Sequence, residues 1–293
     1  MQQSRLQIKD FSNFKSSNVT QEEIQGFKNR KKSDFIELKN YLLDEKNLLS
    51  AELIQEHLFP EVEADIFLSH AHADEDKVIA LAICLEKIGF KTFVDSCIWG
   101  NAHKLLKLID DEYSGHTNGK SYSYQARNFS TANVYMILNT ALHRMIEKSE
   151  LFIFLGTENS ISLKKSIEQQ ESLESPWLFS ELAFVNQVRR YDKRQNLRQQ
   201  ERIKTESSNE SIVTMDSARF VYPKPTLDFV LSNDYFQDWL TKKGELKPHN
   251  SFLKDPFSRC DVHIKKLENL YRLMETKGIK RKFYIDQQFQ NLS

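Results

Sequence analysis

The stretch ADIFLSHAHADEDKVIALAICLEKIGFKTFVDSCIWG, residues 64–100, decides how this chain folds. Its first apolar run stops at Ser69 and His70, and a polar loop follows. Apolar residues then recur at helical spacing, and a second short apolar run ends at Asp95. This order predicts a strand–helix–strand unit of a parallel sheet. The polar residues stand where the strands end, which is where ligands bind in open α/β sheets.

The segments that follow extend the same pattern. Apolar stripes at helical spacing occur in residues 101–112 and again after Thr131, which is a plausible helix cap. The continuous apolar run 151–155 predicts a central parallel strand covered on both faces. Ser175-Pro176 predicts the start of another helix. We therefore predict an α/β fold, a parallel sheet with helices on both faces.

The predicted organisation is one α/β domain with a helical N-terminal extension. Within the extension, Ser50 is a plausible N-cap, so we expect two helices that form either a packed arm or a partner-binding arm. Residues 96–100 are expected to form a loop. The boundaries are a poorly ordered tail at 1–20, the extension at 21–60, the domain at 61–280 with an insertion at 113–130 and a polar linker at 192–210, and a tail at 281–293.

Composition limits the classes of partner. Lys+Arg and Asp+Glu balance at 41 each, so no net field attracts nucleic acid or an anionic membrane. The basic stretch 189–202 is interrupted by acids and favours a solvated linker. Three scattered cysteines suggest neither a disulfide framework nor a metal pair. No stretch reaches the roughly 18 apolar residues that span a bilayer. We expect a cytoplasmic protein with neither membrane nor nucleic acid as partner.

The sharpest local motif is Ser69–Asp74, SHAHAD. As HxHxD after a strand, it resembles the first metal-ligand motif of the metallo-β-lactamase fold, where imidazole and carboxylate suit zinc. Glu75 replaces the histidine that usually ends this motif. We expect no metal, with His70 lining a cleft and Asp74 at the start of a helix. A zinc hydrolase that uses His70, His72 and Asp74 is the lesser alternative.

Four blocks resemble the Toll/interleukin-1 receptor (TIR) domain family, and they stand in the family's order over roughly 61–190. DIFLSHAHADEDK and GFKTFVDSCIWG resemble its first two strands with their loops. ALHRMIEKSELFIFLGTENSI resembles the helix that leads into the next strand, and SPWLFSEL resembles the Trp-x-x-x-Glu-Leu helix. The domain also resembles a bacterial TIR-like group found in phage-defence gene neighbourhoods.

The resemblance implies a flavodoxin-like fold that binds NAD+ as substrate beside the loops after the first two strands. Many family members cleave the nicotinamide–ribose bond, or cyclise or exchange the ADP-ribose product. The resemblance thus implies an NAD+ glycohydrolase or an ADP-ribose-transferring or cyclising enzyme in bacterial antiphage immunity. It also implies a homo-oligomer, with an operon-encoded sensor or effector as a possible partner.

The expected position of the family's catalytic glutamate, three residues beyond Gly100, holds His103. Counting back from the strand at 151–155 gives Leu138 or Asn139, so neither count gives an acid. Asp110 shares a helical face with His103, and these two are the candidate catalytic residues.

Other candidates would bind the nucleotide. Trp99 either stacks on a ring or shields the sheet edge, and Arg127 either contacts a phosphate or belongs to a plain loop. Glu181 is interpreted as structural, pairing across the helix surface. The full set of candidate NAD+-binding residues is Ser69, His70, Asp95, Trp99, Gly100 and Arg127. Because no acid occupies the expected catalytic position, a non-catalytic TIR-like assembly module is the main alternative to the enzyme.

Overall fold

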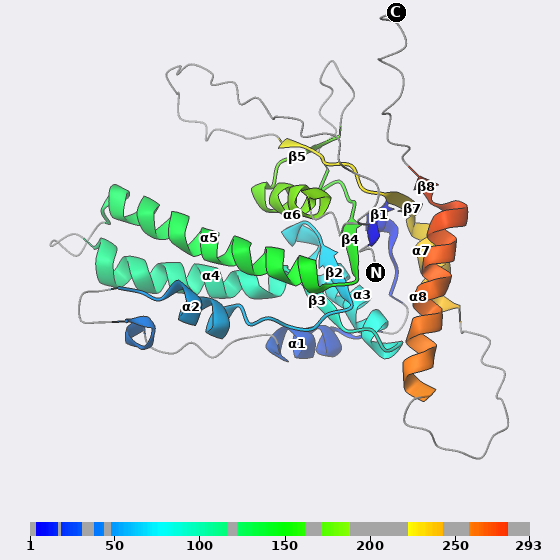
Figure 1. Cartoon of the computed structure of the whole chain (residues 1–293), viewed down its shortest axis with the longest axis horizontal. Coiled ribbons are helices and arrows are strands. Elements are labelled where there is room, and N and C mark those ends of the chain that lie inside the picture. Colours follow the sequence, from blue (N-terminus) through cyan, green and yellow to red (C-terminus); the bar gives the residue numbers. More distant parts are fainter. Residues whose placement is uncertain are drawn as a thin grey trace, which may run out of the picture.

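The computed structural model describes residues 4–16, 19–30, 38–43, 48–115, 122–161, 171–187, 222–242 and 258–280 (Figure 1). Its centre is a six-stranded sheet in the order β3-β2-β4-β1-β7-β8, in which only the β7–β8 pair is antiparallel. The strands are β1 (Ser4–Lys9), β2 (Ile66–Ser69), β3 (Thr92–Val94), β4 (Leu151–Leu155), β7 (Phe229–Ser232) and β8 (Ile279–Lys280). A separate antiparallel pair joins β5 (Ser172–Leu173) and β6 (Tyr222–Pro223). The predicted α/β class with a parallel sheet is confirmed.

The N-terminal strand β1 lies inside the sheet, between β4 and β7. Leu6 stands opposite Ile153 of β4 and Phe229 of β7, and its side chain is fully buried. Counted from β2, the parallel strands take the flavodoxin-like order 2-1-3-4-5, with β1 in the fourth place. For the described residues 4–16 and 19–20 the prediction of a poorly ordered tail is therefore wrong, and the α/β domain, which was predicted to begin at residue 61, already includes β1.

Helices cover both faces of the sheet, as predicted (Figure 1). Because side chains alternate along a strand, Ile66 and Leu68 enter one core while Phe67 enters the other. The first core is covered by α1 (Gln21–Arg30), α3 (Glu75–Lys87), α7 (Asn233–Thr241) and α8 (Ser258–Lys277). The second is covered by α2 (Ala51–Leu58), α4 (Ser96–Ile109), α5 (Tyr124–Lys148) and α6 (Pro176–Gln187).

The N-terminal extension contains two of these helices, as expected, but they are parts of the domain. α1 packs on the first core and α2 on the second. The Ser50 hydroxyl caps α2 by accepting a hydrogen bond from the Leu53 backbone N–H at 3.2 Å. The described residues between 4 and 58 therefore fold as part of the α/β unit.

Two segments predicted as loops are helical. Residues 96–100 form the first turns of α4, because the Asp95 side chain caps the helix by accepting from the Ser96 N–H at 2.8 Å. Within the predicted insertion 113–130, α5 begins at Tyr124 after the cap Ser123, and this cap stands eight residues before the expected cap at Thr131. A π-helical turn, Asp110–Ser114, ends α4, and α4 and α5 run side by side (Figure 1).

The remaining predictions fall partly outside the described residues. The polar linker at 192–210 and the tail at 281–293 lie wholly outside them. The helix expected at 255–275 is α8, and of the strand expected at 218–222 only Tyr222 is described, in β6. Among the helices that the structure describes, none combines the length and apolar character needed to cross a bilayer.

Candidate functional site

A cavity of about 600 Å³ opens at the carboxyl ends of β2 and β3. This is the edge of a parallel sheet where ligands bind in α/β folds. Its walls come from α1, α3, α4, α5 and the start of α6, so elements that are far apart in the sequence contribute to one site. The lining residues are Lys28, His70, His72, Glu75, Asp95, Ser96, Cys97, Gly100, Asn101, His103, Lys104, Tyr135, Ser175, Trp177 and Leu178.

An ion pair between His70 and Asp95 forms the floor of this cavity. His70 follows β2 and Asp95 follows β3, and because these strands are paired in parallel their ends meet. His70 Nδ1 lies 2.7 Å from Asp95 Oδ1, in an ion pair rather than an aligned hydrogen bond, and both side chains are buried. Burial lowers the pKa of His70, but the charge and hydrogen bonding of Asp95, the Leu68 backbone and the charge of Glu75 together outweigh burial, so the pKa is raised above its ordinary value.

A third buried group, Glu181, lies next to this pair. The Ser69 hydroxyl donates a 2.6 Å hydrogen bond to Glu181 Oε2, and Glu181 is fully buried. Burial raises the pKa of Glu181 well above its ordinary value, and the neighbouring Asp95 carboxylate raises it further. The interpretation of Glu181 as a pairing residue on the helix surface is wrong, because α6 turns this carboxyl into the sheet.

Aromatic side chains form one wall of the cavity. Trp177 stands one helical turn before Glu181 on α6, and its ring meets Tyr135 of α5 edge-on at a centroid distance of 5.2 Å. Both residues line the cavity. Such a wall offers a planar surface on which a heteroaromatic ring of a ligand can stack. The Trp-x-x-x-Glu spacing was the sequence signal for this wall and carboxyl, since residues four apart share a helix face.

The structure brings five predicted residues together and leaves others apart. Ser69 contacts Glu181 beneath the cavity, and the cavity lining includes His70, Asp95, Gly100 and His103. For Trp99 the structure describes only the backbone, which belongs to α4, so its predicted role in binding a ring stays a prediction.

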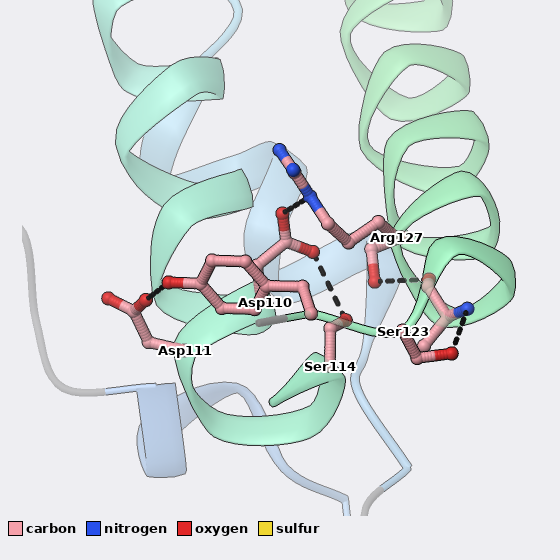
Figure 2. A network of polar contacts seen from close by, with 8 residues as sticks. Asp110, Asp111, Ser114, Ser123 and Arg127 are labelled. Carbon is pink, nitrogen blue, oxygen red and sulfur yellow. Dashed lines mark hydrogen bonds and ion pairs between the residues drawn. The ribbon is translucent and has the colours of Figure 1, made fainter. Parts of the chain in front are cut away.

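Asp110 and Arg127 lie elsewhere, in a polar network at the end of the α4–α5 hairpin (Figure 2). Arg127 Nε donates to Asp110 Oδ2 at 2.9 Å, and the Ser114 hydroxyl donates to Asp110 Oδ1 at 3.2 Å. Asp110 stands ten residues beyond Gly100, about 15 Å along a helix, and does not line the cavity. The contacts of this pair hold the two helix ends together.

The HxHxD residues are held in separate contacts. Asp74 accepts hydrogen bonds from the Thr157 hydroxyl at 2.5 Å and from the Asn159 amide at 2.9 Å, which ties the loop after β2 to the loop after β4. His70 pairs with Asp95, while His72 lines the cavity. Within the described part of the chain, no three or more His, Cys, Asp or Glu side chains are grouped to hold a metal ion.

Comparisons with protein-family models, with curated proteins and with solved structures find no match for this chain.

Proposed function

We propose that this chain is a TIR-like enzyme that consumes NAD+ in the cavity at the ends of β2 and β3. The observation that carries the proposal is the buried Glu181 carboxyl, held against Ser69 and Asp95 beside an aromatic-walled cavity. The antiphage setting, self-association and an operon-encoded partner are proposed on the resemblance to the TIR family.

The proposed reaction breaks the bond between ribose C1′ and the nicotinamide nitrogen. Nicotinamide leaves with the bonding electron pair, and water or an ADP-ribose hydroxyl or ring nitrogen attacks the oxocarbenium-like carbon. Where the attacking group carries a proton, that proton passes to a carboxylate. A carboxylate beside the ribose stabilises the developing positive charge and accepts hydrogen bonds from its hydroxyls. We assign this role to Glu181.

The environment of Glu181 fits a group that ionises when substrate arrives. The pKa of Glu181 is raised by burial and by Asp95, so the neutral carboxyl is favoured. A bound pyridinium ring brings a positive charge, which favours the carboxylate form. The His70–Asp95 ion pair fixes the position of Asp95, and the Ser69 hydroxyl fixes that of Glu181.

Nicotinamide release tests this proposal. Concentrated full-length protein is incubated with NAD+, with and without a crowding agent, and nicotinamide and ADP-ribose species are followed by chromatography. Removal of a preorganised charge-stabilising group costs on the order of 100-fold in rate, so Glu181→Gln should lose activity to about that extent. The exposed carboxyl of Glu112 provides the control variant Glu112→Gln. Full activity in Glu181→Gln would refute the assignment.

Two observations favour a second candidate, a non-catalytic assembly module. Glu181 has no exposed surface and does not belong to the cavity lining, whereas Asp95 and His70 do. The α5 helix also exposes large apolar side chains, with Phe129 at 74% and Met136 at 65% exposure. Such a module would form oligomers that Met136→Lys disrupts, without any NAD+ turnover. Turnover that depends on Glu181 would exclude it.

A further inference from the structure

A buried polar cluster lies where the ends of β2 and β3 meet α6. The Ser69 hydroxyl donates to Glu181 Oε2 at 2.6 Å, and Glu181 is fully buried. The second carboxyl oxygen, Oε1, is also buried and receives no hydrogen bond from any residue that the structure describes. A buried acceptor without a partner destabilises the folded state. The cluster therefore lacks one hydrogen bond as long as Glu181 is ionised.

Asp95 can supply the missing partner when Glu181 carries a proton. Asp95 Oδ1 accepts from the Ser96 N–H at 2.8 Å and pairs with His70 Nδ1 at 2.7 Å. Both contacts use Oδ1, so Oδ2 can accept a further hydrogen bond, and Glu181 lies within hydrogen-bonding reach of Asp95. Two carboxyl groups can share a hydrogen bond only when one of them is protonated. A proton on Glu181 thus joins it to Asp95 and removes one of two adjacent negative charges.

The charges around the cluster identify Asp95 as the group that acts on Glu181. His70 faces Asp95 and Glu75, and the charge of Asp95 acts directly on Glu181. Other titratable groups meet α6 at different residues of the helix. They are Tyr135 at Trp177, Tyr222 at Phe179, His143 at Ser180, and Arg5, which is paired with Asp228, at Val185 and Asn186.

The position of Glu181 on α6 links its proton to the cavity. Trp177 stands one turn earlier on the same helix face and lines the cavity, whereas Glu181 does not. Loss of the proton leaves two buried carboxylates side by side, which weakens the packing of α6 on the sheet. A displacement of the first turns of α6 carries Glu181 toward the wall that Trp177 already forms.

We propose that the proton shared by Asp95 and Glu181 is a latch that holds α6 against the sheet, and that its loss to solvent frees the Glu181 carboxylate to reach the cavity. The protonated, buried carboxyl is then the resting form of the site, and the ionised carboxylate is the active form. The role of the freed carboxylate rests on the proposed function. The latch itself requires no turnover.

Hydrogen exchange measured by mass spectrometry tests the latch without a ligand. The readout is the protection factor of amides in the middle of α6, which corrects for the ordinary increase of exchange rate with pH. Between pH 4.5 and the raised pKa of Glu181, opening of α6 releases one proton, so this protection factor should fall by about tenfold per pH unit. Amides of β4 should stay more protected at every pH, because the opening is local. Glu181→Gln retains the other titratable groups and should remove the pH dependence.

Two variants should shift the pH range in opposite directions. Asp95→Asn removes the neighbouring charge and keeps an oxygen that can cap α4, so the fall in protection should end at a lower pH. Ser69→Ala removes a hydrogen bond that favours the ionised carboxyl, so the fall should extend to a higher pH. A common loss of stability cannot produce shifts of opposite sign.

Nicotinamide release from NAD+, measured over the same pH range, separates the latch from the proposed function. With both in place, release should rise with pH as the protection of α6 falls. Equal pH dependence in wild type and Glu181→Gln, or equal protection of α6 and β4, would overturn the latch even if nicotinamide is released. A latch that opens with pH in a protein that releases no nicotinamide would instead refute the proposed function and leave the latch in place.

Discussion

The substitution Glu181→Gln should change how stability depends on pH. Glutamine keeps the shape of the side chain and remains neutral, whereas the buried carboxyl of Glu181 can ionise. In the folded protein the pKa of Glu181 is raised well above 4.5 by burial and by Asp95. Between pH 4.5 and that raised pKa, the folded state holds a proton that the unfolded state has lost.

This difference fixes both the sign and the size of the effect. The stabilisation from Glu181 is fully present below about pH 4.5 and is lost as the pH rises through the pKa of the folded state. One extra proton in the folded state lowers the free energy of unfolding by about 1.4 kcal/mol for each pH unit. Glu181→Gln lacks this term, so it gains about 1.4 kcal/mol per pH unit relative to the wild type within that range.

Urea unfolding monitored by tryptophan fluorescence at half-unit steps above pH 4.5 measures this directly. His70 is present in both proteins, so its titration contributes to both curves and largely cancels in the difference. Glu112→Gln changes an exposed carboxyl and serves as the matched control. If the free energies of wild type and Glu181→Gln run parallel across the range, Glu181 is ionised in the folded state and the reasoning from burial is wrong.

Three further substitutions test the fold and the site. Leu6→Ala, at a fully buried position, should cost about 2–5 kcal/mol in urea unfolding, while Leu43→Ala, at 66% exposure, should stay within about 0.5 kcal/mol. Asp110→Asn should lower the free energy of unfolding by about 1 kcal/mol, because the ion pair with Arg127 is lost, and should leave nicotinamide release unchanged. Slower nicotinamide release in this variant would show that Asp110 takes part in the reaction. Asp95→Asn should move the NMR titration of His70 to lower pH, because the carboxylate that raises its pKa is gone.

Strands β2 and β4 could be predicted from the sequence because they are buried on both faces. Residues 66–69 and 151–155 read as apolar runs, and the helix between the first two strands shows a regular apolar stripe. Just after that helix, Gly89 adopts a φ of 102°, a backbone conformation that favours glycine. These signals are local, so no knowledge of distant partners is needed to see them.

The N-terminal strand could not be predicted in this way, because its polar residues find partners far along the chain. Arg5 forms two hydrogen bonds with the carboxylate of Asp228, at 2.7 and 2.6 Å. Gln7 accepts a hydrogen bond from Lys224 Nζ at 2.8 Å. In the sequence these polar side chains make residues 4–9 resemble a solvated tail. Their hydrogen-bond partners come together with them only when the chain folds.

The candidate site was also hard to predict from the sequence, because residues far apart in the chain form it. Counting residues from Gly100 leads along α4 to His103 and Asp110, and a helix carries Asp110 away from the strand ends by about 1.5 Å per residue. Glu181 is 112 residues from Ser69, yet its carboxyl reaches the end of β2 because α6 packs on the same core as β2 and β4. A catalytic carboxyl is defined by its distance to the reacting atoms and by its burial. Both depend on how distant elements pack, so spacing along the chain led to Asp110, which lies outside the cavity lining, and not to the buried Glu181 of the Trp-x-x-x-Glu helix.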